Sequence, residues 1–335
     1  MGTEGTLTSY CEAILQAHHH LLDRYPDVFV IGQGLWSPWY VGNSMKDLDK
    51  RYGRERVMDT PTCEDATTAI AAGASLCGYR VLVVHPRVDF MILASNSIVN
   101  QIAKWSHMLG GQARPAVTIR GIVNRGGEQG AQHSQALHSW FAHVPGLRVV
   151  LPATATDARD LLIASVLCPD PVLYIDDRWC YETSETLGPV QELDLAVQGP
   201  KRLLEGEDIT LVGSSYSTHL CLEAAGQLAR SGIRAEVIDL RVINPLRLEP
   251  VVDSVRKTGR LVAVDGSWSS CGLAGEIIAG TTEALPPSAW KSSPQRVTLP
   301  AAPAPTSAPL EKAYYPSASQ VADTARRLMH EDAPT

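Results

Sequence analysis

The feature that most constrains this chain is the alternation of short, β-rich apolar runs with longer helical patterns. In the first half the runs predicted as strands are Val28–Ile31, Val81–Val84, Ala116–Ile119 and Val172–Ile175. The helical patterns cover residues 66–76, 95–109 and 155–167. Strands interleaved with helices predict a mostly parallel sheet that helices cover on both faces.

The alternation stops between about Thr186 and Gly206, where a Pro- and Gly-containing stretch with polar spacing is typical of a linker. It then restarts, with strands at 209–212, 235–239 and 261–264 and helices at 218–231, 250–258 and 272–284. A chain of 335 residues is long enough for two cores. We therefore predict an α/β protein with a first domain at 1–186, a linker at 187–206 and a second, smaller α/β domain at 207–335.

Composition excludes several classes of protein. A net charge of −7 offers no basic surface for nucleic acid. No run approaches the roughly 18 apolar residues that cross a bilayer, and the N-terminus lacks the pattern of a signal peptide. Seven cysteines without a CxxC pair indicate reduced thiols. We expect a cytoplasmic protein with no membrane and no nucleic-acid partner.

Two short motifs carry most of the chemical information. Asp59-Thr60-Pro61 and Glu64 stand directly before a helix of small residues, and Ala131-Gln132-His133-Ser134-Gln135 follows a Gly-rich stretch. Taken alone, Glu64 is explained as an acidic residue in a first helical turn, which complements the helix dipole. The other motifs of the chain decide against that simpler explanation.

With these motifs the chain resembles the β subunits of thiamine-dependent 2-oxo acid dehydrogenase E1 components, of the pyruvate and branched-chain type, in the transketolase-like superfamily. The likeness extends over almost the whole length. The residues that carry it are Asp59-Thr60-Pro61 with Glu64, Phe90, the segment Ala131–Gln135, and Pro145-Gly146-Leu147 with Pro152. The resemblance implies a first domain that binds the pyrimidine of thiamine diphosphate and a transketolase-type C-terminal domain.

The resemblance also implies the roles of two residues toward the cofactor. Thiamine diphosphate becomes a carbanion only when a carboxyl group hydrogen-bonds N1′ of its aminopyrimidine, and Glu64 is the residue expected to do so. Phe90 is expected to pack on the pyrimidine ring, because a flat apolar ring needs an apolar wall. Without the resemblance, Phe90 would be taken as a core residue.

His133 is the second expected catalytic residue, placed by the resemblance in the active-site channel. An imidazole can donate and accept protons near neutral pH, so it suits work on the substrate and its adduct. Its neighbour Gln132 is a further substrate-binding candidate. The alternative is an ordinary loop histidine that hydrogen-bonds the backbone.

One expected element is missing. Enzymes of this superfamily hold the diphosphate through Mg²⁺ with a Gly-Asp-Gly segment and a downstream Asn, and this chain has no Gly-Asp-Gly. We therefore expect an α-type partner chain that supplies this motif and the Mg²⁺, most simply in an α₂β₂ heterotetramer. No metal ligand is predicted in the present chain.

Charged residues near the motifs bear on the substrate. His85 and Arg87 precede Phe90, and Arg125 precedes the Gly-rich stretch. Because arginine recognises carboxylate and phosphate in bidentate fashion, these three residues are candidates for binding an anionic donor. The alternative is that they are solvated loop charges.

The function predicted from the sequence is that of the β subunit of a heteromeric, thiamine-dependent enzyme. It would decarboxylate a 2-oxo acid and transfer the acyl unit to an acceptor, such as a lipoyl or carrier domain. One alternative is a split transketolase-like subunit that takes a two-carbon unit from a ketose phosphate. Another is a scaffold subunit without chemistry, which the presence of both Glu64 and His133 argues against. The sequence does not identify the donor, the acceptor or the pathway.

Overall fold

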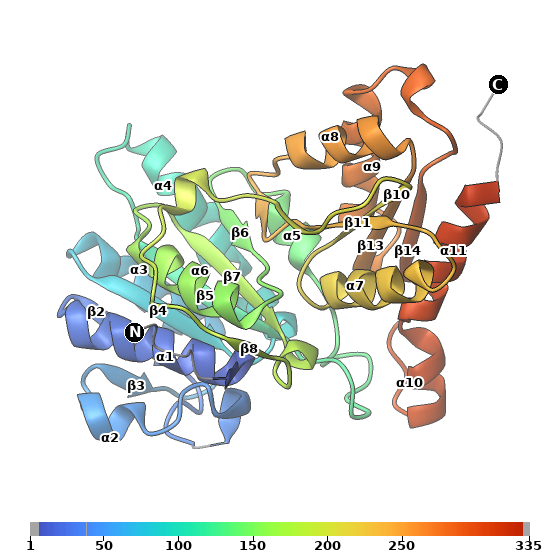
Figure 1. The fold of residues 1–335 in the computed structure, drawn as a ribbon. Coiled ribbons are helices and arrows are strands. Elements are labelled where there is room, and N and C mark those ends of the chain that lie inside the picture. Colours follow the sequence, from blue (N-terminus) through green and yellow to red (C-terminus); the bar gives the residue numbers. More distant parts are fainter. Residues whose placement is uncertain (1–6, 38, 331–335) are drawn as a thin grey trace, which may run out of the picture. The chain divides into compact units, whose positions relative to one another are not determined.

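The computed structural model describes residues 7–37 and 39–330. Its internal contacts divide the chain into two compact units (Figure 1). The first unit contains the residues up to Arg125 together with Trp140–Gln198, and the second contains Gly126–Ser139 together with the residues from Gly199 onward. The second unit therefore includes a segment from the middle of the chain that the linear boundaries 1–186, 187–206 and 207–335 do not separate.

The first unit is built on a parallel sheet. Its strands are hydrogen-bonded in the order β6 (Arg148–Val150), β7 (Val172–Asp177), β5 (Val117–Val123), β4 (Arg80–His85), β2 (Val28–Gly32) and β3 (Val57–Asp59). Because these strands are parallel, their carboxyl ends lie at one edge of the sheet. A separate antiparallel pair joins β1 (Leu7–Ser9) to β8 (Ser184–Thr186).

Helices cover both faces of this sheet, as the alternation in the sequence predicts. One face carries α1 (Tyr10–Arg24) and α6 (Ala155–Leu167). The other carries α3 (Glu64–Leu76) and the irregular helices η2 (Val88–Ala94) and η3 (Asn96–Ile102). The remaining elements of this part of the chain are η1 (Tyr40–Asn43), α2 (Leu48–Tyr52), α4 (Ala103–Met108), α5 (His138–Ala142), η4 (Arg178–Cys180) and η5 (Leu195–Val197).

The helix expected over 95–109 is not continuous. It begins as the π-helix η3 and becomes a regular α-helix only at Ala103. The Ser95 hydroxyl donates to the carbonyl of Ile92, and the Ser97 hydroxyl donates to Asp65 on α3. Such side-chain bonds compete with regular helical pairing.

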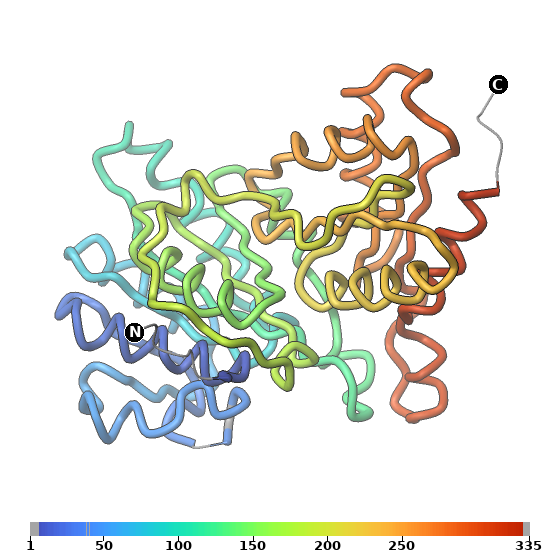
Figure 2. Tube along the Cα trace, viewed as in Figure 1, coloured from blue at the N-terminus to red at the C-terminus, as the bar shows by residue number. Residues whose placement is uncertain are grey.

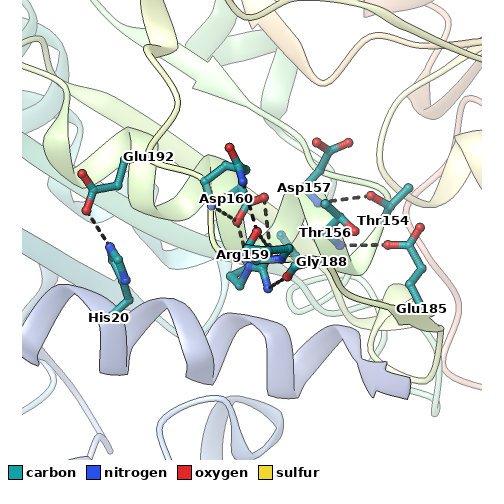
Figure 3. A network of polar contacts seen from close by, with 12 residues as sticks. His20, Thr154, Thr156, Asp157, Arg159, Asp160, Glu185, Gly188 and Glu192 are labelled. Carbon is teal, nitrogen blue, oxygen red and sulfur yellow. Dashed lines mark hydrogen bonds and ion pairs between the residues drawn. The ribbon is translucent and has the colours of Figure 1, made fainter. Parts of the chain in front are cut away.

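A polar network ties the beginning of the predicted linker to the first unit (Figure 3). His20 Nε2 on α1 lies 2.7 Å from Glu192 Oε1, and Arg159 on α6 donates to the carbonyl of Gly188 at 2.9 Å. Arg159 also pairs with its neighbour Asp160 at 2.7 Å. The stretch that the sequence predicts as a linker is therefore ordered against α1 and α6 up to Glu192.

A buried ion pair lies inside the first unit, between β5 and β7. Arg120 and Asp176 are both fully buried, and the guanidinium donates two bonds to the carboxylate, at 3.1 and 2.8 Å. Arg120 also donates to Ser44 Oγ at 2.7 Å, and the Tyr181 hydroxyl donates to Asp176 at 2.5 Å. At this buried position, the opposite charges and the hydrogen bonds together offset the cost of removing both groups from solvent.

The second unit has a mixed sheet. Its strands follow the order β14 (Gln295–Leu299), β13 (Leu261–Trp268), β10 (Ile209–Gly213), β11 (Ala235–Asp239) and β9 (Lys201–Leu204). Only β9 among these strands pairs antiparallel, and it lies within the predicted linker. α7 (Tyr216–Ala229) and α11 (Ala318–His330) cover one face, and α8 (Glu249–Thr258) and α9 (Leu273–Glu283) cover the other. The predicted second α/β domain is confirmed, with β12 (Val242–Asn244), η6 (Pro287–Ala289) and α10 (Ala308–Tyr314) as further elements.

Within the described ranges, no helix has both the length and the apolar character that crossing a bilayer requires.

Candidate active site

The carboxyl edge of the first sheet gathers most of the residues that the sequence singled out. Glu64 follows β3, and Phe90 follows β4. Arg125 follows β5, beside the end of β7. In open parallel α/β sheets this edge is where ligands bind, because the loops that leave it converge there.

Glu64 is the first residue of α3 and is 5% exposed. Its N-cap residue, Cys63, makes no side-chain cap, so the side chain of Glu64 stands at the positive end of the helix dipole. Among the residues that the structure describes, none donates a hydrogen bond to the Glu64 carboxylate or forms an ion pair with it. The Glu64 carboxylate therefore keeps its capacity to hydrogen-bond a ligand.

The neighbours of Glu64 fix the backbone around it. Asp65 accepts a hydrogen bond from Ser97 at 2.6 Å, which joins the start of α3 to η3. Asp59, at the end of β3, accepts from the amide of Gly34 at 2.6 Å, which joins the loop after β3 to the loop after β2. The two other acidic residues of this stretch therefore have structural partners.

Phe90 lies on η2, which contacts α3, and its side chain is partly exposed. η2 approaches the sheet closely at Gly121 on β5. A Cβ at that position would lie 2.2 Å from the sulfur of Met91, the residue after Phe90. Met91 is buried, whereas Phe90 is partly exposed.

His85 is buried behind α3, where its Nε2 atom lies 3.0 Å from the hydroxyl of Thr68. Burial lowers the pKa of His85 to about 4, so the ring is neutral at pH 7. A neutral ring adds no positive charge to the carboxyl edge. A role of His85 toward an anionic donor would have to rest on hydrogen bonding instead of charge.

The two arginines differ in their surroundings. Arg125 is 5% exposed, forms an ion pair with Asp177 and lies with its guanidinium 5.3 Å from the centre of the Trp179 ring. Arg87, just before η2, is partly exposed. The charge of Arg125 is thus already compensated within the protein. The substrate roles of Arg87, Arg125 and His85 remain predictions.

His133 and Gln132 belong to the second unit. Gln132 is exposed and His133 is half-buried, and the amide of His133 donates to the carbonyl of Gly130 at 3.4 Å. The segment contains consecutive left-handed residues, with φ of 82° at Gly126, 68° at Gly127 and 59° at Glu128. Only the glycines adopt this conformation without strain, which explains why the segment is Gly-rich.

These residues fit the pyrimidine half of a thiamine site. Glu64 has a carboxyl group without a hydrogen-bond donor among the described residues, and the partly exposed Phe90 lies on an element that packs against α3. No group of three or more His, Cys, Asp or Glu side chains suited to a metal ion occurs in the described part of the chain. The three consecutive histidines do not share a partner. His18 contacts the carbonyl of Ile14, His19 the hydroxyl of Tyr52 and His20 the carboxylate of Glu192.

Sequence reasoning missed several partners of these residues. His138, five residues after His133, has its Nε2 atom 3.0 Å from Asp265 Oδ1 in the second unit, and both side chains are buried. Glu128 accepts a hydrogen bond from the amide of Ala308 at the start of α10. No local pattern around Glu128 indicates a bond to a residue 180 positions away. No local pattern indicates the pairing of His138 with a residue 127 positions away.

Two doubly wound α/β units, the first with an acidic residue opening a helix at its carboxyl edge, define a transketolase-type architecture. Comparison with known families agrees. Residues 8–179 match the transketolase pyrimidine binding domain, and residues 200–321 match the transketolase C-terminal domain.

Relatives of known description are similar over nearly the whole chain. The β subunit of acetoin:2,6-dichlorophenolindophenol oxidoreductase from Cupriavidus necator is 37% identical, covering 95% of this chain and 96% of the relative. The pyruvate dehydrogenase E1 component subunit beta-1 of Arabidopsis thaliana is 36% identical over 95% of this chain and 88% of the relative. This chain belongs to the family of E1 β-type subunits of thiamine-diphosphate-dependent dehydrogenases.

A solved structure supports the fold. A split-gene transketolase, described as an inactive β₄ tetramer, superposes with a TM-score of 0.78 at 22% identity and covers 96% of this chain and 98% of its own.

Proposed function

We propose that this chain is the β subunit of a heteromeric enzyme in which Glu64 activates thiamine diphosphate for cleavage of a 2-oxo acid or a related acyloin. The observation that carries the proposal is the side chain of Glu64, a residue that is 5% exposed, opens α3 at the carboxyl edge of the first unit's sheet and has no hydrogen-bond donor among the described residues. Bound thiamine diphosphate would supply a carbanion that attacks the carbonyl group of the donor.

In this proposal, residues of this chain have separate roles toward the cofactor and the donor. The carboxyl group of Glu64 would hydrogen-bond N1′ of the aminopyrimidine and thereby promote loss of the C2 proton. Phe90 would pack on the pyrimidine ring and orient it. His133 would bind the donor and move protons on it, with Gln132 beside it. Arg87 would contribute a positive charge for a carboxylate of the donor, and Arg125 would contribute only if its pair with Asp177 opens.

Because this sequence has no Gly-Asp-Gly segment, a partner chain would have to supply the diphosphate half of the site. An α-type chain with Gly-Asp-Gly and a downstream Asn would hold the Mg²⁺ and the diphosphate, and α₂β₂ is the simplest stoichiometry. The acceptor of the acyl unit would be a lipoyl or carrier domain. Relatives named for an α/β division of subunits support the need for a partner.

Two versions of the proposal differ in the donor substrate of the enzyme. The relative from Cupriavidus necator is named for acetoin, whereas several others are named for pyruvate. The assembled enzyme should be supplied in turn with pyruvate, branched 2-oxo acids, acetoin and a ketose phosphate, with 2,6-dichlorophenolindophenol as electron acceptor. Release of CO₂ supports a 2-oxo acid, and release of acetaldehyde supports acetoin. Turnover of the ketose phosphate alone would favour the split-transketolase alternative, and no turnover with an active partner would favour a scaffold role.

The isolated chain should bind thiamine diphosphate weakly or not at all, because it offers contacts to the pyrimidine ring only. Titration calorimetry with and without Mg²⁺ measures this. Micromolar, Mg²⁺-dependent binding corresponds to about −8 kcal/mol and would contradict the proposed division of the site between two chains.

Replacing His133 with alanine should lower turnover of the assembled enzyme by about 100-fold, the scale of one general acid–base group, and leave C2 proton exchange of bound thiamine unchanged. The reason is that His133 is assigned to the donor, whereas Glu64 is assigned to the cofactor. The exposed His143, replaced by alanine, provides a control. An equal loss of exchange and turnover would remove His133 from this role.

A further inference from the structure

The segment that carries His133, Gly126–Ser139, belongs to the second unit, although in the sequence it comes after β5 and before β6, two strands of the first. Figure 2 shows it as a teal-green loop that passes beside the red helix α10. Its two ends make polar contacts with different parts of the second unit, while its middle contains Gln132 and His133.

Glu128 attaches the beginning of the segment. Its Oε1 atom accepts the amide hydrogen of Ala308, the first residue of α10, at 2.8 Å, and its own amide donates to Glu311 Oε2 at 3.1 Å. Two residues later, Gly130 has a φ of 72°, and a Cβ there would lie 2.4 Å from Cγ2 of Thr306. The segment is therefore in close contact with residues 306–311.

His138 attaches the end of the segment. Its Nε2 atom lies 3.0 Å from Asp265 Oδ1, with side chains 5% and 1% exposed. Asp265 also accepts the amides of Ser267 and Ala274, at 3.0 and 3.3 Å. Burial by itself raises the pKa of Asp265, but His138 and these two amides hold it below its usual value. Ser139 adds a bond, because its hydroxyl accepts the amide of Leu273 at 3.1 Å.

Asp265 stands where a doubly wound sheet normally binds a ligand. From β10 the chain passes to β11 on one side and then crosses to β13 on the other, so the topology reverses between β10 and β13. Asp265 lies just beyond Ala263, the last residue of β13 that pairs with β10. The carboxyl edge at such a reversal is the usual ligand site. Here a residue of the chain itself, His138, occupies it.

We propose that Glu128 and His138 are positioning residues, and that the second unit serves the reaction by fixing the His133 segment at both ends. The proposal rests on the role assigned to His133 in the proposed function. The alternative is that these contacts only stabilise the second unit. Positioning and stabilisation alone predict different results when one contact is removed. They differ in which backbone amides exchange faster and in which catalytic step is slowed.

Hydrogen exchange on the full chain tests the attachment without relying on activity. In His138→Ala and in Glu128→Ala, the amides of residues 129–137 should exchange at least about tenfold faster, while those of β10 and β13 keep their wild-type rates. His138→Gln should stay near the wild type, because its amide nitrogen can replace Nε2 as the donor to Asp265. His143→Ala is the matched exposed control. Unchanged exchange in both alanine variants, or faster exchange throughout β10 and β13, would overturn the proposal.

Kinetics of the assembled enzyme test the consequence. His138→Ala and Glu128→Ala should each lower turnover about tenfold or more and leave C2 proton exchange at the wild-type rate. Combining His138→Ala with His133→Ala should lower turnover no further than His133→Ala alone, because a positioning residue acts through His133. Additive losses would refute positioning. An inactive wild-type assembly would instead refute the proposed function, and hydrogen exchange would still decide whether the segment is fixed.

Discussion

Replacing Glu64 with glutamine should lower turnover of the assembled enzyme toward about 10⁴-fold, the upper range for one acid–base group, and should slow C2 proton exchange of bound thiamine to a similar extent. An amide cannot share the proton that N1′ requires. The substitution keeps the size of the side chain, and the carboxylate has no donor among the described residues to lose, so folding and assembly should be nearly unchanged. NMR of deuterium exchange at C2 measures the effect directly.

The neighbouring acid provides the control for this variant. Asp65→Asn retains an oxygen that can accept the bond from Ser97, and Asp65 is exposed at the same helix end. It should keep C2 exchange within a few-fold of the wild type. If Glu64→Gln exchanged at the wild-type rate, Glu64 would return to the simpler explanation of an acidic residue in a first helical turn.

Replacing Asp176 with asparagine should destabilise the first unit by about 3–5 kcal/mol, because it leaves the charge of Arg120 buried without its counter-charge. The loss should appear as a lower midpoint in urea unfolding of the full chain, followed by a probe within the first unit. Asp176 and Arg120 are both fully buried, so water cannot compensate the charge in the folded protein.

Asp170→Asn is the matched control for this effect. Asp170 pairs with Arg148 at 2.9 Å in the same unit, but the side chains are 34% and 19% exposed. Loss of such a solvated pair should cost about 0.2–1 kcal/mol. Equal shifts in the two variants would mean that the Arg120–Asp176 pair gains nothing from its burial.

The fold class could be predicted from the sequence because it depends on local periodicity. The apolar runs at 28–31, 172–175 and 235–239 are strands, and the helix expected at 155–167 has those bounds. The periodicity of the sequence did not reveal α1 or the short strands β3 and β9. Three- or four-residue strands have too few positions to display an alternation of burial. It also predicted one helix over 95–109, where side-chain bonds of Ser95 and Ser97 produce a broken one.

By itself, the sequence determined the family, through several short motifs at matching spacing, and with it the candidates Glu64, Phe90 and His133. The tertiary structure alone decided the surroundings of the candidate residues. The fold places Asp177 against the charge of Arg125 and makes the ring of His85 neutral through burial. It also brings His138 into contact with Asp265. A motif records neighbours along the chain, whereas charge compensation and desolvation depend on residues that the fold brings together from 52 and 127 positions away.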